Sequence, residues 1–186
     1  MELFDAIFTR HSQANLKRDP IPRNVIEKLL SAAVQAPNHY KVRPWRFVVL
    51  TGKGRERLGE AMVASMLSRF PDLDNEAKQN TRNLALRAPL LIAVGVDKPA
   101  DPRVIELENV CAAAAACQNI LLSAHALGLG AKWRTGEWAT DLGVKKFLGF
   151  SADQNVIAFL YIGYPESLTD EYERPSFDDR ATFLDQ

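Results

Sequence analysis

Arg10, His11 and Ser12 stand together directly after an apolar stretch near the amino terminus. Arginine presents a planar, permanently charged fork of donors, and serine and histidine add directional hydrogen bonds. Such a triplet suits the binding of an anion such as a phosphate. Polar residues also fill the first loop of many domains, and basic residues are common on surfaces. The triplet alone therefore leaves two interpretations open, an anion site and a solvated loop.

Two further polar clusters follow apolar segments, Asn38-His39 and Trp133-Arg134-Thr135. The three histidines are scattered, and no His and carboxylate residues occur at the spacing of metal ligands. No Ser-His-Asp or Cys-His set has a recognisable local signature. We therefore expect no metal and no catalytic side chain. Residues that hold an anion and offer aromatic faces without a nucleophile indicate an enzyme whose chemistry belongs to a cofactor.

The composition is that of one globular domain. Of 186 residues, 47% are hydrophobic and 25% are charged, which allows a substantial core. Lys plus Arg and Asp plus Glu both number 23, and this zero net charge argues against a nucleic-acid-binding protein. Apolar runs are short, so we expect no membrane helix and no signal peptide. Cys111 and Cys117 have the spacing of neither a metal site nor a redox pair, which predicts buried free thiols in a cytoplasmic protein.

The periodicity of apolar residues predicts both helices and strands. Helices are predicted at 3–10, 25–34, 54–68 and 74–86, and strands at 47–50, 90–96, 131–135 and 156–162. Asp101 and Pro102 predict the N-cap and first turn of the longest helix, which is expected to continue to about Ala126 and to end at Gly128. Small residues at 111–117 predict that this helix is buried on most sides.

The order and spacing of these motifs resemble those of the FMN-dependent nitroreductase family, and especially its short bacterial NAD(P)H nitroreductase subgroup. The matching motifs are Arg10-His11-Ser12 for the family's Arg-Arg-Ser, Ala36-Pro37 with His39, Pro44-Trp45-Arg46-Phe47, and Trp133-Arg134-Thr135 after Gly128-Leu129-Gly130. The resemblance extends from about Leu3 to Pro165, which is nearly the whole chain.

The resemblance implies an α+β fold with a mixed central sheet flanked by helices, in a homodimer with FMN at the subunit interface. It divides the chain into a flavin domain, 1–165, and a carboxyl-terminal arm, 166–186, which carries Tyr172, Phe177 and Phe183 and is expected to pack on the domain or the partner. The implied FMN contacts are Arg10, His11, Ser12, Trp133, Arg134 and Thr135, with Gln35 and His39 from the other subunit. A nicotinamide-nucleotide contact is implied at Ser123, Ala124, His125, Ala126, Leu127 and Gly128, although the carboxyl end of a helix repels phosphate.

The activity implied is that of an oxidoreductase in which NADH or NADPH reduces FMN. Flavin N5 then reduces a small acceptor such as a nitroaromatic or a quinone, by a ping-pong mechanism. Two alternatives remain: a flavin-binding carrier or sensor with little turnover, and a specialised flavin enzyme such as a reductive dehalogenase. No membrane or nucleic-acid partner is expected.

Four positions depart from the family pattern. His11 replaces the second Arg of the family's triplet, Lys41 and Arg43 replace amide residues before Pro-Trp, and Ala14 replaces a residue that is basic in many larger members. Reduced flavin carries negative charge near N1 and O2, so another cation or amide dipole is expected to face this edge. Arg43 and Arg134 are both candidates for that position.

Overall fold

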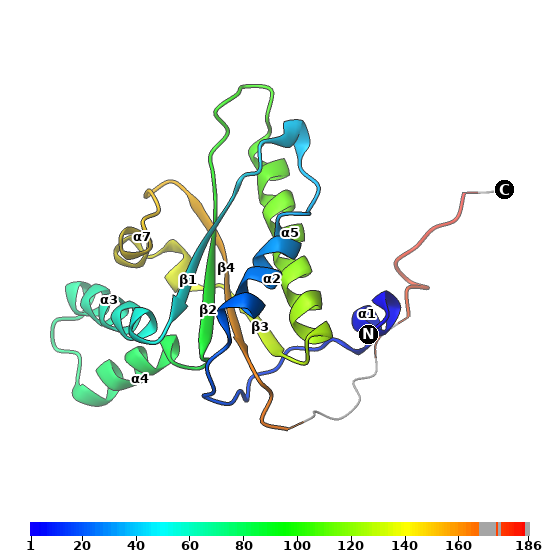
Figure 1. The fold of residues 1–186 in the computed structure, drawn as a ribbon. Helices are drawn as coiled ribbons and strands as arrows, with labels where there is room; N and C mark the ends of the chain where they lie inside the picture. Colours follow the sequence, from blue (N-terminus) through cyan, green and yellow to red (C-terminus); the bar gives the residue numbers. More distant parts are fainter. Residues whose placement is uncertain (168–173, 175, 185–186) are drawn as a thin grey trace.

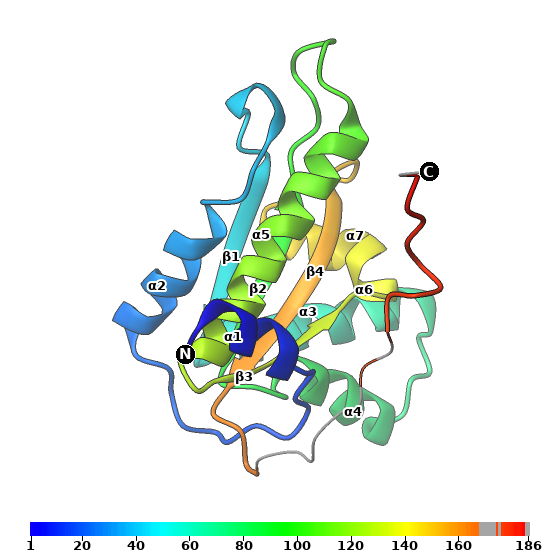
Figure 2. The same ribbon diagram turned by 90° about the vertical axis from the view of Figure 1, so that its right-hand side faces the viewer.

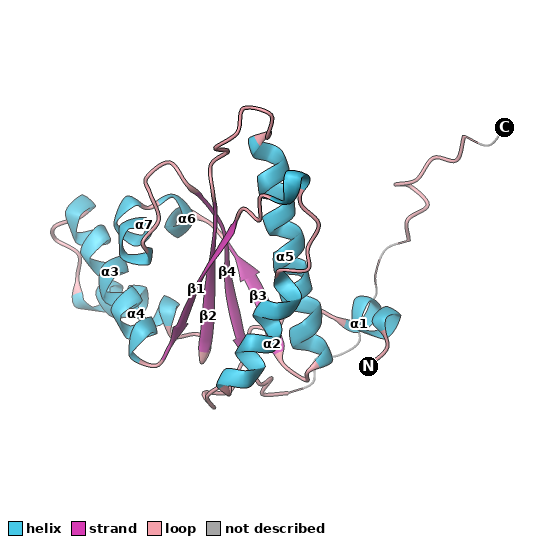
Figure 3. Ribbon diagram, turned by 45° about the horizontal axis from the view of Figure 1, so that its top comes forward, coloured by secondary structure: helices cyan, strands magenta, loops and turns pink. Residues whose placement is uncertain are grey.

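The computed structural model describes residues 1–167, 174 and 176–184, and within them four strands form one sheet with helices on both faces (Figures 1 and 3). The elements in chain order are α1 (Leu3–Thr9), α2 (Arg23–Ala33), the 3-10 helix η1 (His39–Lys41), β1 (Trp45–Thr51), α3 (Lys53–Arg69), α4 (Asn75–Ala85), β2 (Leu90–Val96), α5 (Glu106–Ala126), β3 (Gly130–Arg134), α6 (Glu137–Thr140), α7 (Leu142–Leu148) and β4 (Asn155–Gly163). The predicted strands and the four helices before residue 90 are therefore confirmed within a few residues. The short helices α6 and α7 were not predicted.

The strand order is β1-β2-β4-β3, and each of these neighbouring pairs is antiparallel. A parallel element comes from outside the named strands, where Ser12 forms an isolated bridge with Ala131 of β3. The expected α+β architecture, with a central sheet flanked by helices, is confirmed.

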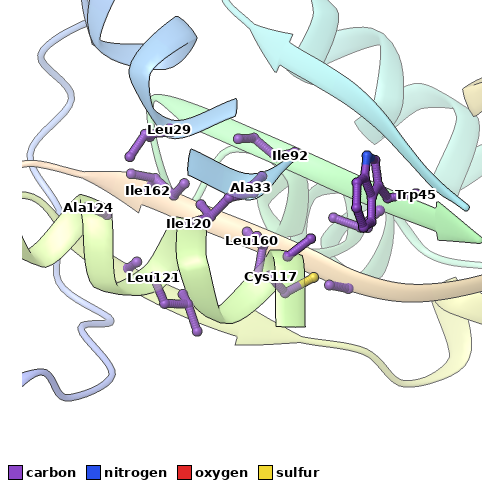
Figure 4. Close-up of a cluster of buried hydrophobic side chains, with 14 of the residues drawn as sticks. Leu29, Ala33, Trp45, Ile92, Cys117, Ile120, Leu121, Ala124, Leu160 and Ile162 are labelled. Carbon is purple, nitrogen blue, oxygen red and sulfur yellow. The ribbon is translucent and has the colours of Figure 1, made fainter. Parts of the chain in front are cut away.

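The sheet separates two cores, and β2 contributes alternate residues to each of them. Leu90, Ile92 and Val94 face α2 and α5, whereas Leu91 and Ala93 face the side of α3, α4 and α7. Because β2 is covered on both faces, its sequence is apolar at every position rather than alternating. The first core contains the middle of α5, where small side chains let the helix lie close to β4 (Figure 4).

Helix α5 begins later than the sequence predicts. Asp101 is not its N-cap, because the Asp101 carboxylate accepts hydrogen bonds from the backbone and guanidinium of Arg103, and its carbonyl accepts one from Val104 at 3.0 Å. These bonds close a separate turn, and the helix starts at Glu106. The predicted end is confirmed: Gly128 has a φ of 76°, and the Leu129 amide donates to the Ala124 carbonyl.

One face of α5 lies open in the single chain, which corrects the expectation of two buried thiols. Cys117 is fully buried, and burial raises the pKa of its thiol to about 12. Cys111 is exposed, because it lies on the face of α5 that also carries Leu107, whose exposed fraction is 67%. The small residues of α5 therefore lie both in the hydrophobic core and on an exposed face of the helix.

The segment that follows α1 is held along β3. The Gln13 amide donates to the Ala131 carbonyl at 3.0 Å, and the Lys17 amide donates to the Tyr164 carbonyl at 2.8 Å. Gly130 makes this approach possible, since a Cβ atom at that position would lie 2.8 Å from Gln13 Cβ and from Leu16 Cδ2. The position of residues 10–16 thus depends on the absence of a side chain at 130.

We expect Gly130→Ala to destabilise the protein by about 1–3 kcal/mol, the usual cost of forcing an extra methyl group into a packed site. Urea unfolding would measure this loss. Gly54→Ala is the matched control, because a Cβ there meets only Leu50 at ordinary contact distance and alanine favours a helix. Equal unfolding midpoints for Gly130→Ala and the parent would show that the close approach is unimportant.

Candidate functional site

Arg10 and Ser12 lie in extended backbone directly beyond α1, at the edge of β3 (Figure 2). Arg10 is half-buried, and burial followed by the charge of Arg174 lowers the pKa of its guanidinium. Arg174 also donates a hydrogen bond to the Arg10 carbonyl. Within the described residues, neither arginine forms an ion pair with an acid that would offset this repulsion. Two neighbouring guanidinium groups without a carboxylate form a site suited to a dianion such as a phosphate.

His125 connects this segment to the carboxyl end of α5. The Thr9 hydroxyl donates its only proton to the Asp5 carbonyl at 2.6 Å, so it must accept at 2.7 Å from His125 Nε2, which therefore carries a hydrogen. The His11 ring lies edge-on to His125, with centroids 6.4 Å apart. Burial, followed by the charges of His11 and Arg10, lowers the pKa of His125. His125 thus anchors α1 beside the anion site.

The third predicted cluster divides between the two faces of β3. The Trp133 indole is half-buried and donates to the Ile157 carbonyl at 2.9 Å, so it contributes to the packing against α5. Arg134 and Thr135 are exposed, and the Arg134 side chain lies on the opposite face. There it lines a small cavity of about 40 Å³ together with Gln13, Ala14 and other residues. The structure therefore brings Arg134 close to the segment that carries Arg10 and Ser12.

Of the residues that line this cavity, only Arg134 was predicted as a site residue; two cations and a phenol that also line it were not, namely Arg87, Lys132 and Tyr161. Lys132 could have been found, because it lies two positions before Arg134 in a predicted strand and must share its face. Arg87 precedes β2 and Tyr161 lies within β4, and neither has a local sequence signal. Only the fold places them here.

Gln35 and His39 lie elsewhere in the single chain. Gln35 donates to the Ser31 carbonyl at the end of α2, and His39 Nδ1 lies 3.3 Å from a Glu108 oxygen at the beginning of α5. Arg10, by contrast, lies near His125 at the end of α5 (Figures 1 and 2). A helix rises 1.5 Å per residue, so Glu108 and His125 are about 25 Å apart. One chain cannot bring both groups of predicted residues to the same mononucleotide.

The loop around His39 has an uncommon backbone. Tyr40, Lys41 and Arg43 all have positive φ values, between 50° and 56°, which residues other than glycine adopt at an energetic cost. The Asn38 carboxamide accepts a hydrogen bond from the Arg43 amide at 2.8 Å and helps to hold this shape. His39, Tyr40, Lys41 and Arg43 are all exposed, so the loop presents a cationic and aromatic surface.

No group of three or more metal-ligating side chains is found among the described residues, and no helix there is long and apolar enough to cross a membrane. The larger hollows lie outside the anion site. One, between α3 and α6–α7, is lined by small residues with Arg69 and Asp141. Another contains His39 and Cys111 on the open side of α5.

Comparison with known proteins places this geometry in a family. The sequence profile of the nitroreductase family matches residues 7–164. YfhC of Bacillus subtilis, which is provisionally named an NAD(P)H nitroreductase, is 29% identical over 181 residues, covering 97% of this chain and 93% of its own. A NADH dehydrogenase/NAD(P)H nitroreductase, also provisionally named, from Methanothermobacter thermautotrophicus is 32% identical and covers 89% of this chain and 78% of its own.

Solved structures have the same fold. A nitroreductase-like family protein from Bacillus cereus superposes with a TM-score of 0.84 at 24% identity, covering 100% of this chain and 97% of its own. A mutant of NfnB, described as an FMN- and NADPH-dependent nitroreductase from a Sphigopyxis strain, superposes with a TM-score of 0.79 at 17% identity over 100% of both chains. The profile match covers most of the sequence, and the chain therefore belongs to the nitroreductase family.

Proposed function

We propose that the protein is a homodimeric, FMN-dependent oxidoreductase that uses NADH or NADPH to reduce small acceptors such as nitroaromatics and quinones. The observation that carries this proposal is the pair of guanidinium groups of Arg10 and Arg174, beside Ser12 and the end of β3. Family membership and the FMN- and NADPH-dependent activity stated for NfnB agree with it. Bound FMN would supply hydride transfer at N5, so the mechanism requires no nucleophilic side chain.

The residues of the chain would position FMN and balance its charge. Arg10, His11 and Ser12 hold the phosphate, with charge-assisted hydrogen bonds from the guanidinium and a further donor from the hydroxyl. Trp133, Arg134 and Thr135 border the remainder of the cofactor. Trp133 acts indirectly, because its indole is bonded to β4 and fixes the strand end.

The nicotinamide-nucleotide contact at residues 123–128 stays a prediction. Ala126, Leu127 and Gly128 are exposed and accessible to a ligand, whereas Ala124 is fully buried. His125 already uses Nε2 to hold Thr9, so it would reach a nucleotide only through its other ring nitrogen.

Gln35 and His39 would reach FMN from the partner subunit. Two-fold symmetry pairs the same surface of both subunits, so two open α5 faces packed antiparallel place the beginning of one α5 beside the end of the other. That arrangement brings the partner's His39 to the Arg10 end. The exposed apolar side chains on this side of the molecule, Leu3, Phe4 and Phe8 of α1 with Ile105 and Leu107, would be covered.

The carboxyl-terminal arm is proposed to lie on the partner as well. Phe177 and Phe183 are exposed in the single chain, while Tyr172 lies outside the described residues. Both exposed aromatic side chains would gain a surface in the dimer.

The first prediction concerns the cofactor and the reaction. Purified protein should release FMN on denaturation and should oxidise NADH or NADPH when a nitroaromatic or quinone is present. Arg10→Ala should weaken FMN binding by about ten- to a hundredfold, because hydrogen bonds to charged groups contribute roughly 1.5–3 kcal/mol. Fluorescence titration measures the affinity, and a panel of acceptors that includes halogenated aromatics measures turnover.

Protein that binds no FMN would overturn the whole proposal. Stoichiometric FMN without turnover on any acceptor would favour a flavin carrier or sensor instead, and selective loss of halide from the halogenated acceptors would favour a dehalogenase.

The second prediction concerns the dimer. Leu107→Glu should raise the dimer dissociation constant by at least about tenfold, because it brings two carboxylates into an apolar contact. FMN affinity should fall in parallel. The control is Leu142→Glu, since Leu142 is exposed to a similar extent, 63% against 67%, but lies on the other side of the sheet. Sedimentation velocity and FMN titration provide the two readouts, and a monomeric Leu107→Glu variant with unchanged FMN affinity would contradict a shared site.

A further inference from the structure

We infer that Arg87, Lys132 and Arg134 form a second anion subsite, which faces the N1–C2=O edge of the flavin and stabilises the negative charge that this edge gains on reduction. The inference rests on the proposed function, because it assigns residues to the same cofactor. It also decides between Arg134 and Arg43, which the sequence leaves open.

The three cations converge from different parts of the chain. Lys132 and Arg134 alternate on one face of β3, and Tyr161 of β4 lies directly opposite Lys132 in the strand register. Arg87 enters from the loop that precedes β2. All four line the cavity of about 40 Å³, together with Gln13 and Ala14. Burial raises the pKa of the Tyr161 hydroxyl, and the charges of Arg87 and Arg134, which line the same cavity, oppose that rise.

Nothing in the described part of the chain neutralises these charges. Arg87, Lys132 and Arg134 take part in no ion pair or hydrogen bond there, and Tyr161 adds a hydroxyl rather than a carboxylate. The neighbouring arginines behave differently, because Arg18 donates to the Leu86 carbonyl and Arg55 to the Ala88 carbonyl. Arg18 and Arg55 therefore have a structural role, whereas Arg87, Lys132 and Arg134 have hydrogen-bond donors available to a ligand in the cavity. Three like charges held together are expected where an anion is bound.

The phosphate is not the best candidate for this anion. Arg10 and Arg174 already form a site for a dianion, and neither of these two arginines lines this cavity. FMN has one other place where negative charge develops. If bound FMN accepted a hydride, which carries two electrons and one proton, its ring would gain one negative charge, spread over N1 and O2. A cation at this edge stabilises the reduced cofactor more than the oxidised one.

Arg43 is less suited to this role. It lies in the loop that precedes β1, and this loop is close to the beginning of α5, where His39 meets Glu108. Only the partner's copy of Arg43 could therefore approach the same FMN. Lys132 is the better residue to test, because it lies on strand β3 and its side chain belongs to neither hydrophobic core.

The experiment measures the midpoint potential of bound FMN, together with the affinities of oxidised FMN and of riboflavin, which lacks the phosphate. Lys132→Met and Arg87→Gln should each bind oxidised FMN within about threefold of the parent but bind reduced FMN about tenfold more weakly. For a two-electron couple, a tenfold change corresponds to a potential about 30 mV more negative. Lys53→Met, which removes an exposed lysine at the start of α3, should leave the potential unchanged.

The alternatives give different results. An unchanged potential in both variants, or a fall caused by Arg43→Gln alone, would overturn the inference while leaving the proposed function intact. Weaker binding of FMN but not of riboflavin, at constant potential, would show that the cluster holds the phosphate, which also overturns it. Absence of FMN binding in the parent would instead refute the proposed function itself. Arg87→Gln provides a second, independent variant if Lys132→Met proves unstable.

Discussion

The edge contact between residues 12–17 and the strand pair β3–β4 is the constraint on which the site depends. Backbone hydrogen bonds to Ala131 and Tyr164 fix the segment, and Gly130 lets it lie directly against the sheet. This contact sets Arg10 and Ser12 at one end and Ala14 beside Arg134 at the other. A loop with the same residues that did not pack against the sheet would leave the charged side chains in solvent, where they would repel one another and bind an anion only weakly.

The length of helix α5 sets the distance between two groups of predicted site residues. Its beginning carries Glu108 beside His39, and its end carries His125 beside Thr9 and the anion site. One face of the helix packs on the sheet, and the other remains open along Leu107 and Cys111. A helix of this length separates the two groups of predicted FMN contacts by more than one mononucleotide. Under the proposed function, a second copy would invert the helix and bring the two groups together, so that dimerisation and cofactor binding would be coupled.

Local sequence patterns predicted most of the fold, because strand β2 is a continuous apolar run, helix α2 carries a clear apolar period, and Gly128 ends α5 as expected. The misses have physical causes. Asp101 has the chemistry of an N-cap, but its carboxylate is taken by Arg103. Helix α7 did have signals at both ends: the Asp141 side chain accepts a hydrogen bond from the Val144 amide at its start, and Gly149 has a positive φ at its end. The helix is too short, however, to show a helical period of apolar residues. Arg87 and Tyr161 reach the cavity only through strand pairing, which no local motif encodes, and Cys111 could not be placed without knowing which face of α5 is covered.

The most direct test of the account is to mix two defective subunits. One carries Arg10→Ala, and the other carries Gln35→Ala with His39→Ala; each homodimer should bind FMN more weakly than the parent. If every site takes residues 10–12 from one subunit and residues 35 and 39 from the other, the mixed dimer has one intact site and one doubly defective site. Titration of purified mixed dimers should then give one FMN per dimer at the parental affinity. Two equally weakened sites, or a Gln35→Ala/His39→Ala homodimer with unaltered affinity, would contradict the shared site.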